Sequence, residues 1–201
     1  MKEVIFGTKN PGKLAHVQAA LKPLGIEVKS IAEFGDLPDV EEDGKTAQEN
    51  SKKKALFYSR SINKPVLSMD NALYIDGLKD SQQPGIHVRR IPGHMGRPTD
   101  EEVLHYCSNL IKNHGGNMTG HFEFAICFAF PDGKTKEVTA ITKSRYFTDK
   151  ISAKRLKGYP LESLQFDREL NKYVAEMTAE ESDKFWQNSV GKELREIFSK
   201  L

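Results

Sequence analysis

The sequence predicts an α/β protein whose long mixed β-sheet is flanked by helices. In the N-terminal part, short apolar runs alternate with amphipathic segments, as in strand–helix–strand units. Further on, a long apolar run at 121–130 is followed by a turn and by an alternating segment at 135–142, which is typical of an antiparallel hairpin. We expect one α/β domain of two lobes over residues 1–201, with the hairpin-rich second lobe at roughly 117–165.

The N-terminal elements are predicted from apolar spacing. Val4-Ile5-Phe6 predicts a buried strand, and a polar turn separates it from a helix. Gly25 ends that helical region and leads into a second strand at 25–28. The apolar side chains that share one face of the helix are Leu14, Val17 and Leu21.

A second strand–helix unit follows an acidic loop at 35–45. Thr46 can cap a helix that runs to about Ser61, and Glu49, three residues after Thr46, completes a capping box. The apolar run at 65–69 predicts a buried strand that ends at Asp70. Because ligands gather at the carboxyl ends of strands in open α/β sheets, Asp70 is placed for a functional role.

The C-terminal elements begin after a glycine-, proline- and arginine-rich loop at 77–97. Thr99 and Glu102 form a capping box for a helix that closes at 115–116. A third strand of the hairpin region is expected near 145–147. Thr178 and Glu181 open the last helix, whose apolar stripe is Val190, Leu194, Ile197 and Leu201.

Composition excludes several classes of protein. Of the 201 residues, 38% are hydrophobic and 29% are charged, which predicts a globular protein able to bury its own core. Its 30 basic and 28 acidic residues almost balance, so we expect no nucleic-acid partner. No apolar stretch reaches membrane-spanning length, so we expect no membrane partner. Cys107 and Cys127 lack metal-ligand spacing and suggest reduced thiols in a cytoplasmic protein.

The turn at 7–13 has the composition of a phosphate-binding turn. It joins the first strand to a helix N-terminus, where backbone N–H groups and the helix dipole favour an anion. Thr8 and Asn10 add neutral hydrogen-bond donors, and Lys13 adds a positive charge. The spacing is not that of a Walker P-loop. An ordinary strand-to-helix turn with a solvated lysine remains the alternative.

Acidic and basic residues further along the chain could complete such a site. Mg²⁺ is normally held by one or two carboxylates together with substrate phosphates, and Glu42 and Asp70 could supply the carboxylates. Lys13 and Lys54 could then neutralise phosphate. Alternatively, Glu42 is a solvated loop acid and Lys54 lies on a solvated helix face.

Taken together, these motifs resemble the inosine/xanthosine triphosphate pyrophosphatase family. Its members hydrolyse non-standard purine nucleoside triphosphates to the monophosphate and pyrophosphate. The resemblance is strong over residues 1–90 and looser to the end, where 175–177 and 180–181 match the start of the family's last helix. The segments in the family's order and spacing are Thr8–Lys13, Glu42–Thr46, Glu49–Asn50, Lys54–Ala55, Asp70, Leu73, Asp76–Leu78 and Pro84–Gly85.

The resemblance implies a role for each matching residue. Asp70 would be the general base and, with Glu42, would bind Mg²⁺. Lys184 would match the family's C-terminal lysine, which lies near the nucleotide. The remaining matches would contact the substrate: Thr8, Asn10, Lys13 and Lys54 at the triphosphate, and Asn71 in place of a family serine. The family also implies a nucleotide cleft between the two lobes, a homodimer and a cytoplasmic location.

Two segments depart from the family, and both recognise the base there. The family's aromatic loop is replaced by 158–166, and a Ser-His-Arg triplet is replaced by 188–190. Phe185 and Trp186 either line the base pocket or belong to the core of the last helix. We therefore expect an Mg²⁺-dependent nucleoside triphosphate pyrophosphatase with an altered base preference. The alternatives are a pyrophosphatase for a different base and a catalytically inactive nucleotide-binding sensor or partner protein.

Overall fold

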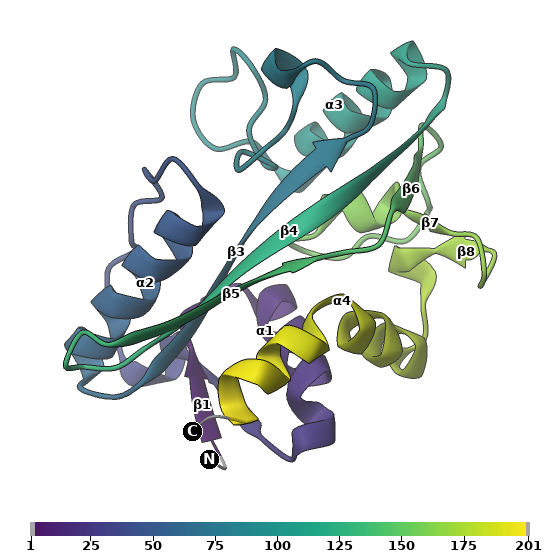
Figure 1. Cartoon of the computed structure of the whole chain (residues 1–201). Helices are drawn as coiled ribbons and strands as arrows, with labels where there is room; N and C mark the ends of the chain where they lie inside the picture. The colour runs from purple at the N-terminus through teal and green to yellow at the C-terminus, as the bar shows by residue number, and fades with distance from the viewer. Residues whose placement is uncertain (1–2, 200–201) are drawn as a thin grey trace. The chain divides into compact units, whose positions relative to one another are not determined.

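The computed structural model describes residues 3–199, and within them it shows the expected mixed α/β fold (Figure 1). Six strands of the described chain form one mixed sheet in the order β2-β1-β3-β4-β5, with β6 paired to β4. β1 pairs in parallel with β2 and β3, whereas β4 pairs antiparallel with β5 and β6. The strands are β1 (Glu3–Phe6), β2 (Glu27–Ser30), β3 (Val66–Ile75), β4 (Asn117–Ala129), β5 (Thr135–Ile141) and β6 (Arg145–Thr148).

The helices lie close to their expected positions. The α-helices are α1 (Pro11–Leu21), α2 (Ala47–Ile62), α3 (Asp100–Asn113) and α4 (Ala179–Ser199). Short 3-10 helices are found at Lys22–Leu24, Ile31–Phe34, Asp80–Gln82, Pro160–Ser163 and Val174–Glu176, and a small hairpin is made by β7 (Phe166–Asp167) and β8 (Lys172–Tyr173). No helix of the described residues is long and apolar enough to cross a membrane.

The described chain divides into two compact units. The first contains residues 3–71, 123–141 and 183–199, and the second contains residues 72–122 and 142–182. The range expected for a second lobe, 117–165, contributes residues to both units, so the division into lobes remains a prediction.

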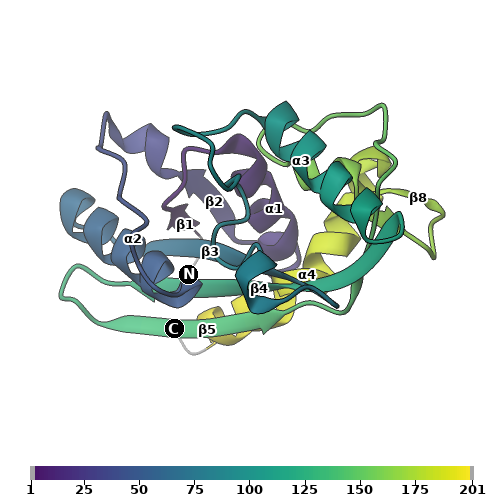
Figure 2. The same cartoon turned by 90° about the horizontal axis from the view of Figure 1, so that it is seen from above.

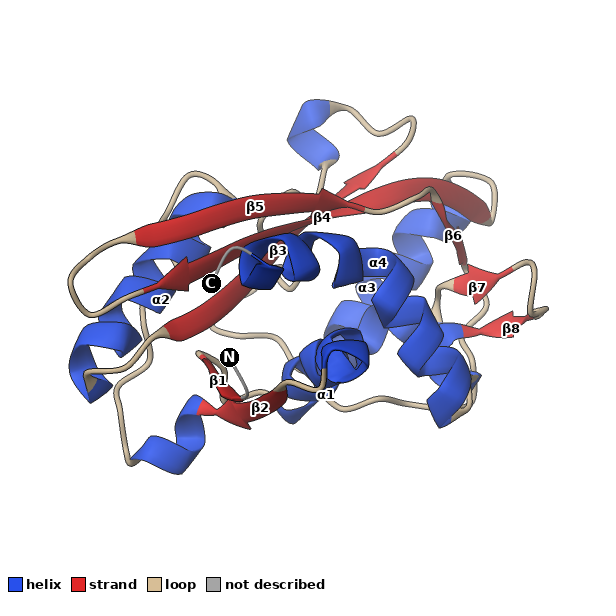
Figure 3. Cartoon of the chain, turned by 60° about the horizontal axis from the view of Figure 1, so that its bottom comes forward, coloured by secondary structure: helices blue, strands red, loops and turns tan. Residues whose placement is uncertain are grey.

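In the first unit, α1 and α4 bury the apolar stripes that the sequence predicts. Val17 and Leu21 of α1 are fully buried and Leu14 is half-buried, and Val190, Leu194 and Ile197 of α4 are also buried. Leu201, the last member of the predicted stripe, lies outside the described residues. The short strands β1 and β2 lie side by side next to α1 (Figure 3).

The predicted hairpin is formed by β4 and β5, whose strands run side by side (Figure 2). Its turn is closed by the bond from Phe130 N to Lys134 O at 2.9 Å. Gly133 has a φ of 92°, a conformation that favours glycine. α2 is fastened to β5 through Glu137, which lies 2.8 Å from Lys52 Nζ and accepts a bond from Gln48.

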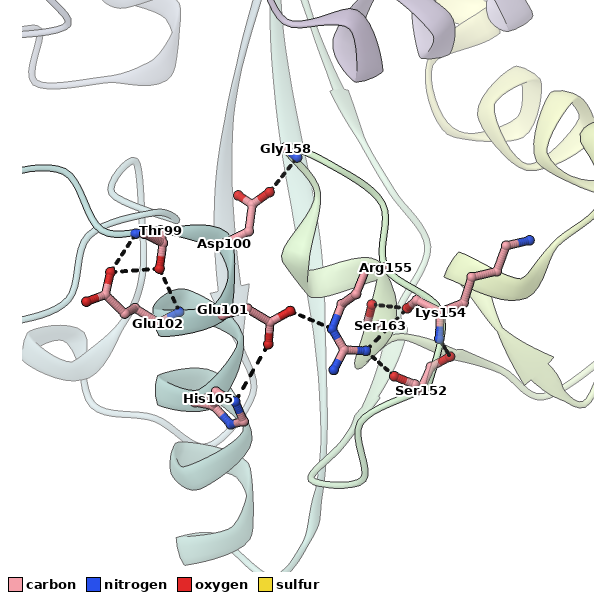
Figure 4. Close-up of polar contacts among 10 residues, drawn as sticks. All are labelled: Thr99, Asp100, Glu101, Glu102, His105, Ser152, Lys154, Arg155, Gly158 and Ser163. Atoms are coloured by element: carbon pink, nitrogen blue, oxygen red, sulfur yellow. Dashed lines mark hydrogen bonds and ion pairs between the residues drawn. The ribbon is translucent and has the colours of Figure 1, made fainter.

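In the second unit, α3 holds the irregular segment 152–159 through polar contacts (Figure 4). The expected capping box of Thr99 and Glu102 is present. The next side chain, Asp100, accepts a bond from Gly158 N at 2.6 Å, and Glu101 pairs with Arg155 Nε at 2.7 Å. These contacts tie a segment without regular structure to the first turn of a helix.

The sequence was misleading at the start of α2. Thr46 caps the helix as expected, because its Oγ1 accepts a bond from Glu49 N at 3.1 Å. The Glu49 side chain does not complete the expected capping box, since its carboxylate accepts a bond from Lys45 N at 2.7 Å instead. A capping box is present at α4, where Thr178 and Glu181 bond reciprocally.

Candidate active site

The β1–α1 turn is organised by its own side chains. Asn10 is the N-cap of α1, and its Oδ1 accepts bonds from Gly12 N at 2.9 Å and Lys13 N at 3.4 Å. Thr8 Oγ1 accepts a bond from Asn10 N at 3.1 Å. We expected the backbone N–H groups of this turn to meet an anion, but Asn10 already occupies two of them. Within residues 3–199, no partner takes the Asn10 amide nitrogen or the Thr8 hydroxyl proton, so these remain as donors for a ligand.

Asp70 lies within a strand and not at its end, which corrects the sequence prediction. The strand continues to Ile75 because apolar residues follow, and Leu73 forms a bridge with Gly85. The parallel pairing between β1 and β3 nevertheless stops at Phe6 and Leu67. Asp70 therefore lies just beyond the point where β1 turns into α1, on the part of β3 that β1 no longer covers.

The Asp70 carboxylate is buried beside a lysine of α1. Asp70 is 6% exposed, and Lys13 Nζ lies 3.9 Å from its Oδ1. A buried carboxylate needs a compensating charge or hydrogen bonds. A separation of 3.9 Å gives charge compensation without a direct hydrogen bond. The pair therefore leaves coordination capacity on the carboxylate.

The acidic loop before α2 brings Glu42 to Lys54. The two side chains are in direct contact, with Lys54 largely buried and Glu42 about half exposed. The loop is fixed where it enters the helix, since Gly44 N donates to Asn50 Oδ1 at 2.7 Å. A Cβ at Gly44 would come within 2.6 Å of that oxygen, so only glycine fits this approach. Glu42 is thus positioned by a rigid entry to α2.

The same loop binds a lysine that the sequence analysis overlooked. Lys9, inside the β1–α1 turn, donates to Leu37 O at 2.6 Å and lies 3.0 Å from Asp39 Oδ1. The hydrogen bond with Asp39 raises the pKa of Lys9. The position of Lys9 between the two predicted phosphate donors, Thr8 and Asn10, is the sequence signal that could have identified it.

Six of the eight predicted site residues therefore make pairwise contacts within one unit: Thr8 with Asn10, Lys13 with Asp70, and Lys54 with Glu42. Asn71 is half-buried next to Asp70 in β3, and Lys184 is exposed in the second turn of α4. The substrate-binding roles of Asn71 and Lys184 remain predictions.

The first departing segment, 188–190, lies in α4, where Asn188 is exposed and the other two side chains are buried. Val190 is fully buried, and Ser189 Oγ donates to Phe185 O at 2.7 Å. Trp186, for which a pocket and a core position were both possible, is 5% exposed and belongs to the core. Its ring stacks on His16 with centroids 3.7 Å apart, and burial lowers the pKa of His16 to about 3.

The other departing segment, 158–166, uses its polar groups internally. Ser163 Oγ donates to Lys154 O at 2.7 Å (Figure 4). Glu162 is 3% exposed, and burial raises the pKa of its carboxyl to about 8. Burial therefore favours the neutral, protonated form of this acid in the folded chain.

The carboxylates of the site suit a hard cation that takes part of its ligands from elsewhere. Glu42 and Asp70 each lie beside a lysine, and the described residues contain no group of three or more His, Cys, Asp or Glu that could hold a metal. Mg²⁺ typically takes one or two carboxylates and completes its shell with water and phosphate oxygens. The donor set fits such an ion.

Sequence comparisons place the chain among known proteins. The model of the Ham1 family matches residues 4–188. A dITP/XTP pyrophosphatase of Bacillus subtilis is 31% identical over 186 residues, which cover 92% of this chain and 90% of the relative. A dITP/XTP pyrophosphatase of Geobacillus kaustophilus is 31% identical over 187 residues, covering 91% of this chain and 87% of the relative.

Solved structures share the fold at lower identity. A HAM1 protein from Coxiella burnetii has a TM-score of 0.76 and 21% identity, with full coverage of both chains. The Ham1 protein of Staphylococcus aureus has a TM-score of 0.72 and 22% identity, again over 100% of each chain.

Proposed function

Because the chain belongs to the Ham1 family, we propose that it is a nucleoside triphosphate pyrophosphatase, which hydrolyses its substrate to a nucleoside monophosphate and pyrophosphate. The observation that carries the proposal is the buried Asp70 carboxylate, which has Lys13 3.9 Å away and retains coordination capacity. The relatives named dITP/XTP pyrophosphatases support the same reaction.

In this proposal, the β1–α1 turn and α2 bind the triphosphate. The Thr8 hydroxyl and the Asn10 amide donate to phosphate oxygens, and Lys13 and Lys54 compensate their charge. Asn71 and Lys184 contact the nucleotide. Charge compensation at the phosphates also stabilises the transition state, because negative charge is redistributed as the linkage breaks.

Asp70 is the general base and, with Glu42, the proposed ligand of Mg²⁺. The ion, when bound, supplies Lewis-acid stabilisation of the phosphate oxygens. Asp70 accepts a proton of the attacking water, whose oxygen bonds to a phosphorus of the linkage between the α- and β-phosphates as that linkage breaks, and pyrophosphate leaves. Lys13 Nζ, 3.9 Å from Asp70 Oδ1, gives the buried carboxylate a compensating charge.

We further propose that the base preference differs from that of the named relatives. Recognition of a purine requires polar groups directed at its edge, and in these segments, 158–166 and 188–190, the hydroxyls of Ser163 and Ser189 bond to the backbone of the chain itself. Hydrolysis is therefore better supported than a preference for inosine or xanthosine.

The test is a product assay on the purified protein. It would be incubated with Mg²⁺ and a panel of standard and modified nucleoside triphosphates, and monophosphate and pyrophosphate would be quantified separately. Equal amounts of the two products are expected. Binding of triphosphates without either product would favour the inactive sensor, and release of orthophosphate alone would contradict the proposed bond cleavage.

The assembly and location are also proposals. We propose a cytoplasmic homodimer, as the family resemblance implies. Cys107 and Cys127 are free cysteines, and burial raises the pKa of each thiol to about 12, which suits reduced structural thiols. A light-scattering mass of one 22.7 kDa chain at all concentrations would exclude the dimer.

A further inference from the structure

One lysine of the β1–α1 turn is directed to the acidic loop that precedes α2. Lys9 lies in the β1–α1 turn between the two neutral donors, Thr8 and Asn10. Its side chain instead reaches the acidic loop, where Nζ contacts Leu37 O at 2.6 Å and Asp39 Oδ1 at 3.0 Å. A cation at the centre of an anion-binding turn is thus occupied by a carboxylate of the same chain.

We propose that Lys9 is a further triphosphate-binding residue. In this proposal Lys9 pairs with Asp39 until the polyphosphate chain of a substrate replaces Asp39 as its partner. The inference rests on the proposed function, because it adds a residue to the same site. It assigns Asp39 the part of an internal competitor that lowers the affinity for phosphate.

The loop itself does not need to move for this exchange. Leu37 and Val40 pack against the buried cluster of Ile5, Ile31, Tyr58 and Val66. Tyr58 also donates its hydroxyl to Pro38 O at 3.2 Å. Asp39 stands between these anchored residues with its side chain 83% exposed. A change of rotamer at Lys9 is therefore sufficient, and lysine has a long flexible stem for it.

The exchange is favoured by the relative strengths of the two contacts. Lys9 and Asp39 have side chains 37% and 83% exposed, and such solvent-exposed ion pairs contribute little because water and salt screen them. A polyphosphate offers several negative oxygens to the three N–H donors of one ammonium group. It also meets Lys13 and the two neutral donors at the same turn. The polyphosphate therefore displaces the Asp39 carboxylate from Lys9.

A simpler role for Lys9 is to staple the acidic loop to the turn. In that case Asp39→Asn and Lys9→Gln would both lower the thermal stability, and neither would change the affinity for phosphate. The two roles therefore predict different effects of Asp39→Asn on phosphate binding: a gain in affinity if Asp39 competes with phosphate, and no change if Lys9 only stabilises the loop. Thermal stability alone does not distinguish them.

The experiment is a double-mutant cycle on tripolyphosphate binding, measured by calorimetry at low ionic strength with the full chain. Asp39→Asn should bind tripolyphosphate roughly two- to fivefold more tightly than wild type, the range expected for release of an exposed ion pair. Lys9→Gln should bind roughly tenfold more weakly. In the double variant, Asp39→Asn should give no gain, because the lysine it releases is absent.

Two acids serve as matched controls. Asp43 lies in the same loop and pairs with Lys53 at 2.6 Å, and Asp132 pairs with Lys134 at 2.9 Å in the β4–β5 turn. Asp43→Asn and Asp132→Asn remove the same charge without releasing Lys9, so the affinity should stay within twofold of wild type. Circular dichroism would confirm that each variant is folded, and Lys9→Met replaces Lys9→Gln if the latter is not.

The inference is overturned if Asp39→Asn binds tripolyphosphate no more tightly than wild type. It is also overturned if the gain persists in the Lys9→Gln background, since that would be a through-space effect of charge. Because no hydrolysis is measured, failure of the proposed function appears separately, as an absence of monophosphate and pyrophosphate in the product assay.

Discussion

The β1–α1 turn with its acidic loop and the two departing segments use polar residues in opposite ways. In the turn and loop, charged side chains form ion pairs with each other, as Lys9 does with Asp39 and Lys54 with Glu42. In 158–166 and 188–190, Ser163 and Ser189 bond to the backbone and Glu162 is buried, while Asn188 is exposed. We propose that the first region exchanges its internal contacts for an anion, whereas Ser163, Ser189 and Glu162 of the second are already bonded to the chain or buried.

This difference separates two tasks that one nucleotide site usually combines. Phosphate is bound by charge and by simple donors, which tolerate changes around them. A base is distinguished by hydrogen-bonding groups placed at its edge, and a single replacement changes the preference strongly. In this chain, the residues for the first task match those of the resembled family, and those for the second do not.

The largest effect is expected at Asp70. Asp70→Asn is nearly isosteric but removes the proposed base and metal ligand, so turnover should fall by about 10³-fold, in the range of general-base catalysis. Steady-state release of pyrophosphate, together with thermal unfolding, measures both consequences. Asp132→Asn, at an exposed turn, is the matched control. A near-wild-type rate of hydrolysis in Asp70→Asn would show that Asp70 is not the general base.

Glu162 tests whether the departing segment keeps its polar groups for the fold. Its folded pKa of about 8 lies above the ordinary value of 4.5. The stabilisation this gives is therefore complete below pH 4.5 and is lost as the pH rises through 8. A shift of this size corresponds to a loss on the order of 3 to 5 kcal/mol.

Glu162→Gln cannot ionise, so its free energy of unfolding should lack this part of the pH dependence. Urea unfolding at pH 5 and pH 9 measures the difference, and Glu169→Gln, in the exposed β7–β8 turn, is the control. Equal pH dependence in wild type and Glu162→Gln would mean that this carboxyl is ionised in the folded chain and available to a ligand.

Lys13 tests the first region directly. Lys13→Ala removes a charge-assisted contact to phosphate, which is worth about 1.5 to 3 kcal/mol, so triphosphate binding should weaken roughly 10- to 100-fold. Binding of the corresponding nucleoside should not change, because the lysine acts on charge alone. Calorimetry with both ligands makes the comparison, with Lys134→Ala as the control. Equal weakening of both ligands would show that the turn does not bind the phosphates.

Much of the fold was predictable because local signals agreed with tertiary packing. The β4–β5 hairpin and the helices opened by Thr99 and Thr178 have clear turn or capping residues, and all are present. The strand through Asp70 was predicted too short. Its second half is stabilised by distant partners, such as the bridge from Leu73 to Gly85, which periodicity does not reveal.

The sequence predicts candidate residues for the site, but it does not predict the contacts among them. Sequence motifs selected Lys13, Asp70, Lys54 and Glu42, yet nothing in the spacing shows which lysine meets which acid. Lys9 was missed because a solvated lysine and an occupied lysine look alike in sequence. The use of the Asn10 side chain as an N-cap likewise depends on the backbone conformation at that residue.

The smallest effect is expected for the choice of base, because we expect replacing one base of the substrate by another to change kcat/KM only little. A site with a purine-reading histidine and arginine rejects bases lacking the matching groups by several orders of magnitude, because its own buried polar groups would be left unpaired. Here Ser189 and Val190 replace those residues, and one bonds to the helix backbone while the other is fully buried. No comparable penalty then falls on adenine, guanine or the pyrimidines. The kcat/KM values for ITP, XTP, the standard nucleoside triphosphates and their deoxy forms should therefore lie within about tenfold of each other. A profile dominated by ITP and XTP, with the others near background, would show that residues outside 158–166 and 188–190 recognise the purine, and that the two regions do not divide the work as proposed.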